Sequence, residues 1–295
     1  MGDKTNIGWT DSTWNPITGC SKVSAGCKHC YAARIWPRLA GNDKTVYFDR
    51  AFTNVQCHPE VLIQPVRWVR PRMIFVNSMS DTFHADVPDA FIDQIFAVML
   101  LSGQHIFQVL TKRIERAVSY LSDPDRKMRV VAAARALLAS GKADFNGYIF
   151  PDDIQWPLPN VWIGTSVEDQ IAADARIWQL LNLPATIRFV SVEPLIGAVN
   201  LKAVLDANGR MFNALSGEGK LDWVIVGCES GSQRRKLDID WVRALRAVCG
   251  EHEVPFFLKQ LFLDGKLVSE PVLDGRHSIE LPQQQVIAVQ IKKAA

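Results

Sequence analysis

The chain has 295 residues, of which 48% are hydrophobic and 22% are charged. This composition excludes a disordered chain, a collagen-like repeat and a coiled coil, and it supplies enough apolar side chains for a large core. The 33 Lys and Arg residues nearly balance the 31 Asp and Glu residues, giving a formal charge of +2. Nucleic-acid binding through overall charge is therefore not indicated, although a local basic face is compatible with these numbers.

The sequence also predicts a cytoplasmic protein. No apolar run approaches the ~18 residues of a membrane-spanning helix. The first residues, MGDKTNIGWTDSTWNP, are polar and lack the apolar core of a signal peptide. We therefore expect no contact with a membrane.

Three of the six cysteines fall within one short loop. Cys20, Cys27 and Cys30 have the spacing C-x6-C-x2-C, which in a long cytosolic chain favours metal ligation over a disulfide framework. Iron–sulfur clusters are held by thiolates, and three cysteines leave one iron with an open position. We therefore expect an iron–sulfur cluster here.

Zinc is the main alternative for this loop. A structural zinc site takes four protein ligands, so a fourth residue is needed. His29 lies between two of the cysteines, where its ring is expected to point away, and Cys57-His58 could supply a ligand from a distance. A loop that holds no metal is the third possibility.

Beyond the loop, short apolar runs alternate with amphipathic stretches. The runs are rich in Val, Ile and Phe, as is typical of strands buried on both faces, and cover residues 73–76, 106–110, 161–163, 187–190, 223–226 and 255–258. Helical periodicity covers residues 90–101, 114–121, 129–138, 169–181 and 240–249. This α/β alternation predicts a parallel sheet, and we favour a partial TIM barrel of the (β/α)6 type over an open doubly wound sheet.

Each predicted strand is followed by polar or reactive side chains. Those of interest are, in chain order, Ser80 and Asp81, Lys112, Ser166 and Glu168, Glu193, and Cys228 and Glu229. Barrel enzymes build their active sites from the carboxyl ends of the strands. Helix caps explain one polar residue per strand but not this whole set. The pattern therefore predicts a functional site at one end of the sheet.

Two segments depart from the repeating unit. Residues 122–160 form a long connection with one amphipathic helix, and a substrate-contacting lid and a plain surface excursion both fit it. Residues 261–295 contain the turn signals Asp264-Gly265 and Asp274-Gly275, which predict a hairpin appendage. We expect residues 1–295 to form one barrel domain that carries both segments.

The cysteine loop resembles that of the radical S-adenosylmethionine superfamily, with C-x6-C-x2-C as a variant of the common C-x3-C-x2-C. The chain more closely resembles a family of phage and prophage proteins classed as radical-S-adenosylmethionine-like, and distantly resembles spore photoproduct lyase. The segments that carry the resemblance are WTDSTWNPITGCSKVSAGCKHCYA, VNSMSDTFH, LTKRIER, PNVWIGTSVED, VSVEPLIG and FFLKQ. In place of the Gly-Gly-Glu that many superfamily members carry, this chain has Asn77-Ser78-Met79.

The resemblance implies a partial barrel of the radical S-adenosylmethionine kind and a cofactor pair. Cys20, Cys27 and Cys30 would hold a [4Fe-4S] cluster, where S-adenosylmethionine would be cleaved reductively to methionine and a 5′-deoxyadenosyl radical. An electron donor such as flavodoxin or ferredoxin would reduce the cluster. By similarity to the lyase, the residues that would face S-adenosylmethionine are Ser80, Asp81, Lys112 and Ser166.

Physical chemistry suggests roles for these residues. Lys112 would pair with the methionyl carboxylate, and Asp81 or Glu168 would accept hydrogen bonds from ribose hydroxyls. On the substrate side, Cys228 is either a hydrogen-atom donor or a small buried residue. Glu193 and Glu229 are either proton carriers or partners of Arg113, Arg234 or Arg235. The substrate is unknown, and nucleotide or nucleic-acid modification or repair is the class we favour.

Two other classes of function compete with this one. The first is a non-catalytic zinc or iron–sulfur module that recognises nucleic acid or a protein. The second is a metal-independent enzyme that uses Glu193 and Glu229 as an acid/base pair.

Overall fold

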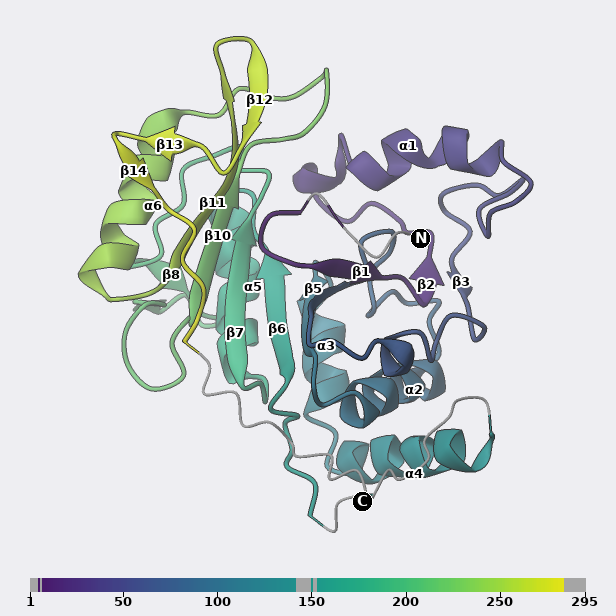
Figure 1. Ribbon diagram of the computed structural model, residues 1–295. Helices are drawn as coiled ribbons and strands as arrows, with labels where there is room; N and C mark the ends of the chain where they lie inside the picture. The colour runs from purple at the N-terminus through teal and green to yellow at the C-terminus, as the bar shows by residue number, and fades with distance from the viewer. Residues whose placement is uncertain (1–4, 6, 142–149, 151–152, 284–295) are drawn as a thin grey trace.

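A curled sheet forms the centre of the structure, and its parallel strands follow one another in chain order (Figure 1). We describe it from a computed structural model, which covers residues 5, 7–141, 150 and 153–283. The sheet contains, in spatial order, β1 (Ser12–Trp14), β4 (Met73–Val76), β5 (Ile106–Thr111), β6 (Val161–Ser166), β7 (Ile187–Val192), β10 (Trp223–Gly227), β11 (Phe256–Leu263) and β12 (Lys266–Ser269). Neighbours are parallel up to β11, and β12 pairs with β11 antiparallel.

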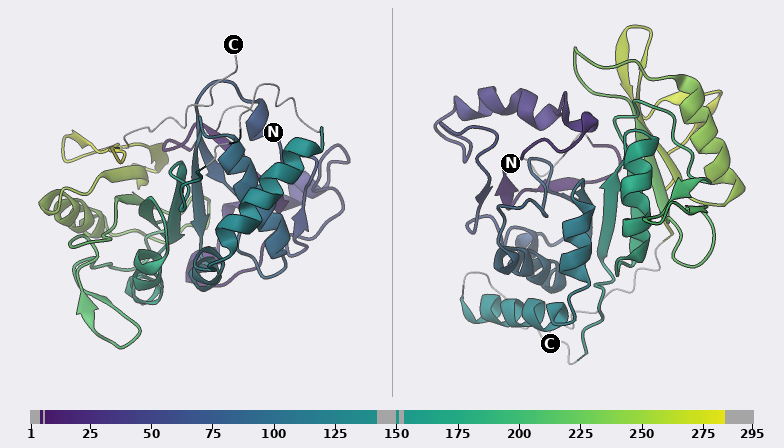
Figure 2. Two further views of the ribbon diagram at one scale, coloured as in Figure 1. Left: turned by 90° about the horizontal axis from the view of Figure 1, so that it is seen from below. Right: turned by 180° about the vertical axis from the view of Figure 1, so that it is seen from behind.

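The helices lie mostly along one face of this sheet (Figure 2). They are α1 (Tyr31–Ala40), α2 (Asp89–Leu101), α3 (Ile114–Leu121), α4 (Arg126–Ala139), α5 (Gln170–Asn182) and α6 (Ile239–Glu251), with 3-10 turns η1 (Ala25–Cys27) and η2 (Pro65–Arg67). Aspartates begin two of them, because Asp169 accepts a hydrogen bond from the Ala172 N–H and Asp238 accepts one from the Asp240 N–H. The predicted strand–helix alternation is thus confirmed, with a mostly parallel half-barrel as the result.

Alternation along the strands divides the core into two layers. In β10, Val224 and Val226 belong to the large cluster shared with the helices. Trp223 and Ile225 belong to an aromatic cluster on the other face, with Trp9, Trp162 and Phe189. Both faces of the central strands are therefore buried, which explains why their sequences are continuously apolar.

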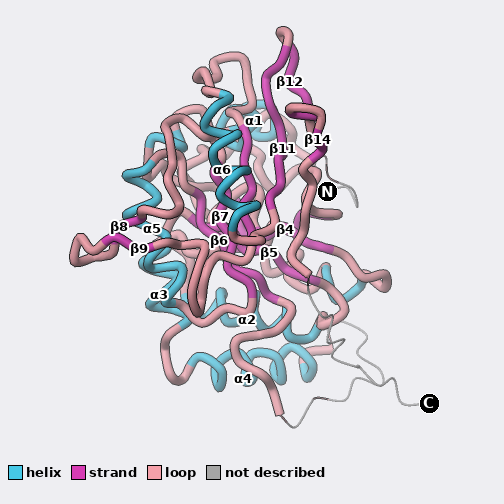
Figure 3. Tube along the Cα trace, turned by 90° about the vertical axis from the view of Figure 1, so that its left-hand side faces the viewer, coloured by secondary structure: helices cyan, strands magenta, loops and turns pink. Residues whose placement is uncertain are grey.

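The connection between β7 and β10 contains a hairpin that the sequence analysis does not predict. Between β7 and β10 the chain forms no α-helix and makes a small hairpin of β8 (Val204–Leu205) and β9 (Met211–Phe212). Figure 3 shows this hairpin on the outer side of the molecule, next to α5. A further short pair joins β2 (Ile17–Thr18) to β3 (Gln56–Cys57), beside the cysteine loop.

The two departing segments have separate positions. In the 122–160 segment, α4 packs on α2, where the buried Arg126 side chain forms ion pairs with Asp89 and Asp93. Figure 1 shows α4 at the opposite end of the molecule from α1. Residues 142–149 and 151–152 of this segment, and 284–295 of the tail, lie outside the described residues.

The predicted hairpins of the tail are confirmed. Asp264 and Gly265 form the turn between β11 and β12, and Asp274 and Gly275 form the turn between β13 (Val272–Leu273) and β14 (Arg276–His277). All four turn residues have positive φ, as type I′ turns require. No helix among the described residues is long and apolar enough to cross a membrane.

Gly164 tests the packing of the inner layer. A Cβ added at Gly164 would lie 2.5 Å from the Phe189 ring on the neighbouring strand. We expect Gly164→Ala to lower the free energy of unfolding by about 1–3 kcal/mol. The control Gly250→Ala, in α6 with open space around the new methyl group, should raise it by about 0.5–1 kcal/mol. Urea unfolding measures both, and an unchanged Gly164→Ala protein would contradict the packing of this layer.

Candidate functional site

The cysteine loop lies over the carboxyl ends of the central strands. Cys20 follows β2, Cys27 ends η1, and Cys30 is the residue before the first turn of α1. All three are free thiols and half-buried. Three strand ends contact this loop: the segment after β4 at Gly19, the end of β5 at Cys20, and the segment after β6 at Gly26.

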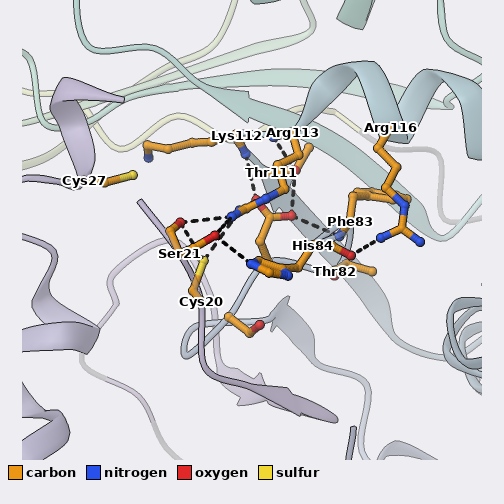
Figure 4. Close-up of polar contacts among 12 residues, drawn as sticks. Cys20, Ser21, Cys27, Thr82, Phe83, His84, Thr111, Lys112, Arg113 and Arg116 are labelled. Carbon is orange, nitrogen blue, oxygen red and sulfur yellow. Dashed lines mark hydrogen bonds and ion pairs between the residues drawn. The ribbon is translucent and has the colours of Figure 1, made fainter. Parts of the chain in front are cut away.

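Asp81 and Arg113 form the contact at Cys20. The Asp81 carboxylate is buried, and its oxygens accept hydrogen bonds from the Thr111 hydroxyl at 2.7 Å and the Lys112 N–H at 3.0 Å. It also accepts one from Arg113 Nη1 at 3.1 Å. Arg113 then donates to Cys20 Sγ at 3.5 Å and to the Ser21 carbonyl at 2.9 Å (Figure 4). Asp81 thus fixes a guanidinium against the first cysteine.

Glu168 forms the contact at Gly26. Its carboxylate is buried, accepts the Gly26 N–H at 3.2 Å, and pairs with Arg176 at 2.9 Å. Burial alone would raise the pKa of Glu168, but the Ser24 hydroxyl, Arg176 and the Gly26 N–H outweigh it and lower the pKa below its usual value. A Cβ at position 26 would lie 3.1 Å from the Glu168 carboxyl carbon, so this close approach favours glycine.

Ser80 forms the third contact, since its hydroxyl donates to the Gly19 carbonyl at 2.6 Å. Gly19 has φ +89°, a backbone conformation that favours glycine, and a Cβ there would lie 2.4 Å from the Asn54 carbonyl oxygen. Ser80 and Asp81, which the resemblance places at the cofactor, and Glu168, expected there as a ribose acceptor, therefore all have partners within the protein that position the loop.

A Ser–His–Asp grouping also occurs beside Cys20. His84 Nε2 lies 2.8 Å from the Ser21 hydroxyl oxygen, and His84 Nδ1 accepts the Asp86 N–H at 3.2 Å. Burial and Arg113 lower the pKa of His84, so the ring is neutral and carries its proton on Nε2. That nitrogen donates to Ser21 and does not accept its proton. The arrangement supports the loop and does not activate a serine nucleophile.

Lys112 and Ser166 remain available at this end of the sheet. The Lys112 ammonium is half-buried and has no hydrogen-bond or ion-pair partner among the described residues. Figure 4 shows its side chain extending toward the cysteine loop beside Cys27. Ser166 is buried at the end of β6, in register with Ser191 of β7.

Glu193 and Cys228 lie together on the β7–β11 side. Lys259 donates to both Glu193 oxygens, at 2.7 and 2.8 Å, and the Gln260 amide donates at 3.1 Å. Cys228 is buried, and its carbonyl accepts from the same Gln260 amide at 2.8 Å. Burial, followed by the Glu193 charge, raises the pKa of the Cys228 thiol to about 11.

The structure shows which cations pair with Glu193 and Glu229. Glu229 pairs with Arg235 at 2.6 Å, as one reading of the sequence predicts, whereas Glu193 pairs with Lys259 and with none of the three arginines considered. Each glutamate is engaged by its own cation. This does not favour an unpaired acid/base couple of Glu193 and Glu229.

Arg176 has no place in the sequence analysis, and Lys259 enters it only as part of the strand-end segment FFLKQ. The signal for Lys259 is a lysine within the apolar run FFLKQ, where only a buried partner makes a charge tolerable. Arg176 lies on α5 and reaches Glu168 only because of the fold, so the local sequence carries no signal for it.

The donor set of the loop, three thiolates, is the kind that iron–sulfur clusters use. Within the described residues, no three His, Cys, Asp or Glu side chains are grouped closely enough to hold one metal ion. His58 is a candidate zinc ligand, but both of its ring nitrogens are hydrogen-bonded. Nε2 lies 2.7 Å from the Thr18 hydroxyl oxygen, and Nδ1 lies 3.1 Å from a Glu60 carboxylate oxygen. In a [4Fe-4S] cluster each thiolate binds a different iron, so the sulfurs need not converge on one point.

Comparison with known proteins identifies the family of this chain. A family described as "Protein of unknown function (DUF5131)" matches residues 4–282. The chain belongs to this family. The match spans the cysteine loop, every strand of the half-barrel and both C-terminal hairpins. No curated protein and no solved structure matches the chain.

Glu168 provides a test of the loop contacts. Glu168→Gln leaves the buried Arg176 without its counter-charge, so we expect the free energy of unfolding to fall by about 3 kcal/mol. The control is Glu251→Gln, which breaks an exposed pair with Lys202 and should cost less than about 1 kcal/mol. Urea unfolding compares the two variants. Equal losses would show that Glu168 is not a structural anchor.

Proposed function

We propose that this protein is a radical S-adenosylmethionine enzyme built on a partial barrel. The observation that carries the proposal is the position of three free thiols on one loop, tied to three successive strand ends of a parallel half-barrel. Barrel enzymes place their chemistry at this end of the sheet. The resemblance of the cysteine segment to the superfamily and to the phage-type family supports the same function.

Cys20, Cys27 and Cys30 would hold the [4Fe-4S] cluster. When bound, the cluster supplies the electron that cleaves S-adenosylmethionine into methionine and a 5′-deoxyadenosyl radical. Contacts of the chain hold these thiols in place. Arg113 donates a hydrogen bond to Cys20 Sγ, and Cys30 stands directly before the first residue of α1.

Cys20 must lose its proton before it can bind iron. Burial raises its pKa to about 11 in the metal-free chain, although Arg113 opposes this rise. Metal binding is therefore coupled to proton release.

Lys112 would bind the methionyl carboxylate, because its side chain points toward the loop and has no hydrogen-bond or ion-pair partner among the described residues. Ser166 would contribute a hydroxyl from the end of β6. Asp81, Glu168 and Ser80 are assigned to positioning, since their oxygens are engaged with the loop and its neighbours.

On the substrate side, Cys228 would donate a hydrogen atom to the substrate radical, and the thiyl radical left behind would return to the thiol by taking up a proton and an electron from the electron donor. Its raised pKa keeps the S–H intact at neutral pH, which such a donor requires. Glu193, held by Lys259, would accept hydrogen bonds from substrate. A nucleotide or nucleic acid is the substrate class that we favour, and flavodoxin or ferredoxin is the class of electron donor.

The test is anaerobic reconstitution with iron and sulfide, followed by S-adenosylmethionine and a strong reductant. We expect about four irons per chain and formation of 5′-deoxyadenosine, both lost in Cys27→Ala. Cys57→Ala is the matched control, because Cys57 is a half-buried cysteine on β3, outside the loop, and it should retain both.

Lys112→Ala separates cofactor binding from cluster assembly. It should retain the iron but bind S-adenosylmethionine at least tenfold more weakly, because it lacks the proposed carboxylate partner. Zinc in place of iron in anaerobically purified protein, or a loaded cluster that produces no 5′-deoxyadenosine, would contradict the proposal.

A further inference from the structure

Four carboxylates near the cysteine loop are each paired with one cation of the chain. The pairs are Asp81–Arg113 at 3.1 Å, Glu168–Arg176 at 2.9 Å, Glu193–Lys259 at 2.7 Å and Glu229–Arg235 at 2.6 Å. Cations beyond these pairs are in excess over these four carboxylates.

Two arginines from different elements supply part of this excess. The Arg34 guanidinium of α1 lies against the loop after β10, with its Cζ 3.4 Å from where a Gly231 Cβ would stand. Arg234, on that same loop, lies over the Phe262 ring of β11 at 3.8 Å, and its charge reaches Cys228. Neither arginine has an ion-pair or side-chain hydrogen-bond partner within the part of the chain that is described.

Further cations extend this positive surface along α1. Arg38 follows Arg34 by one helical turn, so both lie on one exposed side of the helix. Lys28 is exposed on the cysteine loop just before α1. Figure 1 shows α1 and the β11–β12 hairpin at the same end of the sheet. The cations therefore come from three segments at this end: the cysteine loop, α1 and the loop after β10.

We infer that Arg34, Arg38 and Arg234 bind the phosphates of a single-stranded nucleic acid, whose base enters the site beneath the cysteine loop. This inference rests on the proposed function, from which we take the place where the base would react. Arginine pairs with phosphate through its planar fork. Phe262 is 42% exposed, and its ring holds the Arg234 guanidinium at 3.8 Å. We choose a single strand because enzymes that do chemistry on a base act on single strands or take the base out of the duplex.

The test is fluorescence anisotropy of a fluorescein-labelled single-stranded oligonucleotide with the full chain, titrated over a range of salt. We expect salt-dependent binding by the wild type. The double variant Arg34→Ala/Arg234→Ala should bind at least tenfold more weakly, and two lost contacts should reduce the salt slope by about 1.4. Arg34→Ala alone is the second variant, because this exposed side chain can be removed without disturbing the core.

Arg210→Ala is the matched control, since Arg210 is an exposed arginine beside β9 on the outer side, and it should bind like the wild type. Binding that the Arg34 and Arg234 variants leave unchanged would overturn the inference. Equal competition by adenosine monophosphate would also overturn it, by identifying a small phosphorylated ligand. Duplex that binds as well as the single strand would do the same.

Because the oligonucleotide assay needs no S-adenosylmethionine, its outcome is independent of the proposed chemistry. If the oligonucleotide does not bind, the proposed function can still be supported by formation of 5′-deoxyadenosine, because that assay contains no nucleic acid. Conversely, binding by a protein that never cleaves S-adenosylmethionine would contradict the proposed function and keep the nucleic-acid surface.

Discussion

The buried Glu168 carboxylate is the contact on which the position of the cysteine loop most depends. It joins the end of β6 to Gly26, one residue before Cys27, and is itself held by Arg176 of α5. A loop of this length has little apolar surface to bury, so its conformation depends on polar contacts with the sheet. The Asp81–Arg113 pair and Ser80 give it two more attachments. Three thiols are thereby held above the half-barrel before any metal binds.

The same contacts divide the charges of the site into two groups. The Asp81–Arg113 and Glu168–Arg176 pairs position the loop, and removing one partner of either pair would leave the other charge buried and unpaired. Unpaired cations are free to bind ligands. Lys112 points toward the loop, whereas Arg34 and Arg234 lie farther along the surface. This separation is the physical basis for assigning one cation to S-adenosylmethionine and the others to phosphates.

The sequence predicts the elements of the fold well, because buried parallel strands have a continuous apolar pattern that few other structures share. It also predicts that Ser80, Asp81, Lys112, Ser166 and Glu168 follow strands and lie at one end. The tasks of these residues are harder to predict. The sequence of Asp81 and Glu168, acids that follow strands, is the same whether they bind a cofactor or position the loop. Only the tertiary contacts with Arg113 and Arg176 show that their oxygens are engaged. The β8–β9 hairpin escaped prediction because two-residue strands have almost no periodicity.

The most direct measurement of the central claim is the electron paramagnetic resonance spectrum of the reconstituted, reduced protein with and without S-adenosylmethionine. In the proposed cluster, the iron without a protein ligand would bind the added S-adenosylmethionine, which would change that iron's environment. We therefore predict the signal of a reduced [4Fe-4S] cluster whose shape changes when S-adenosylmethionine is added. A cluster signal that S-adenosylmethionine leaves unchanged would contradict it, as would a protein that takes up zinc and gives no cluster signal.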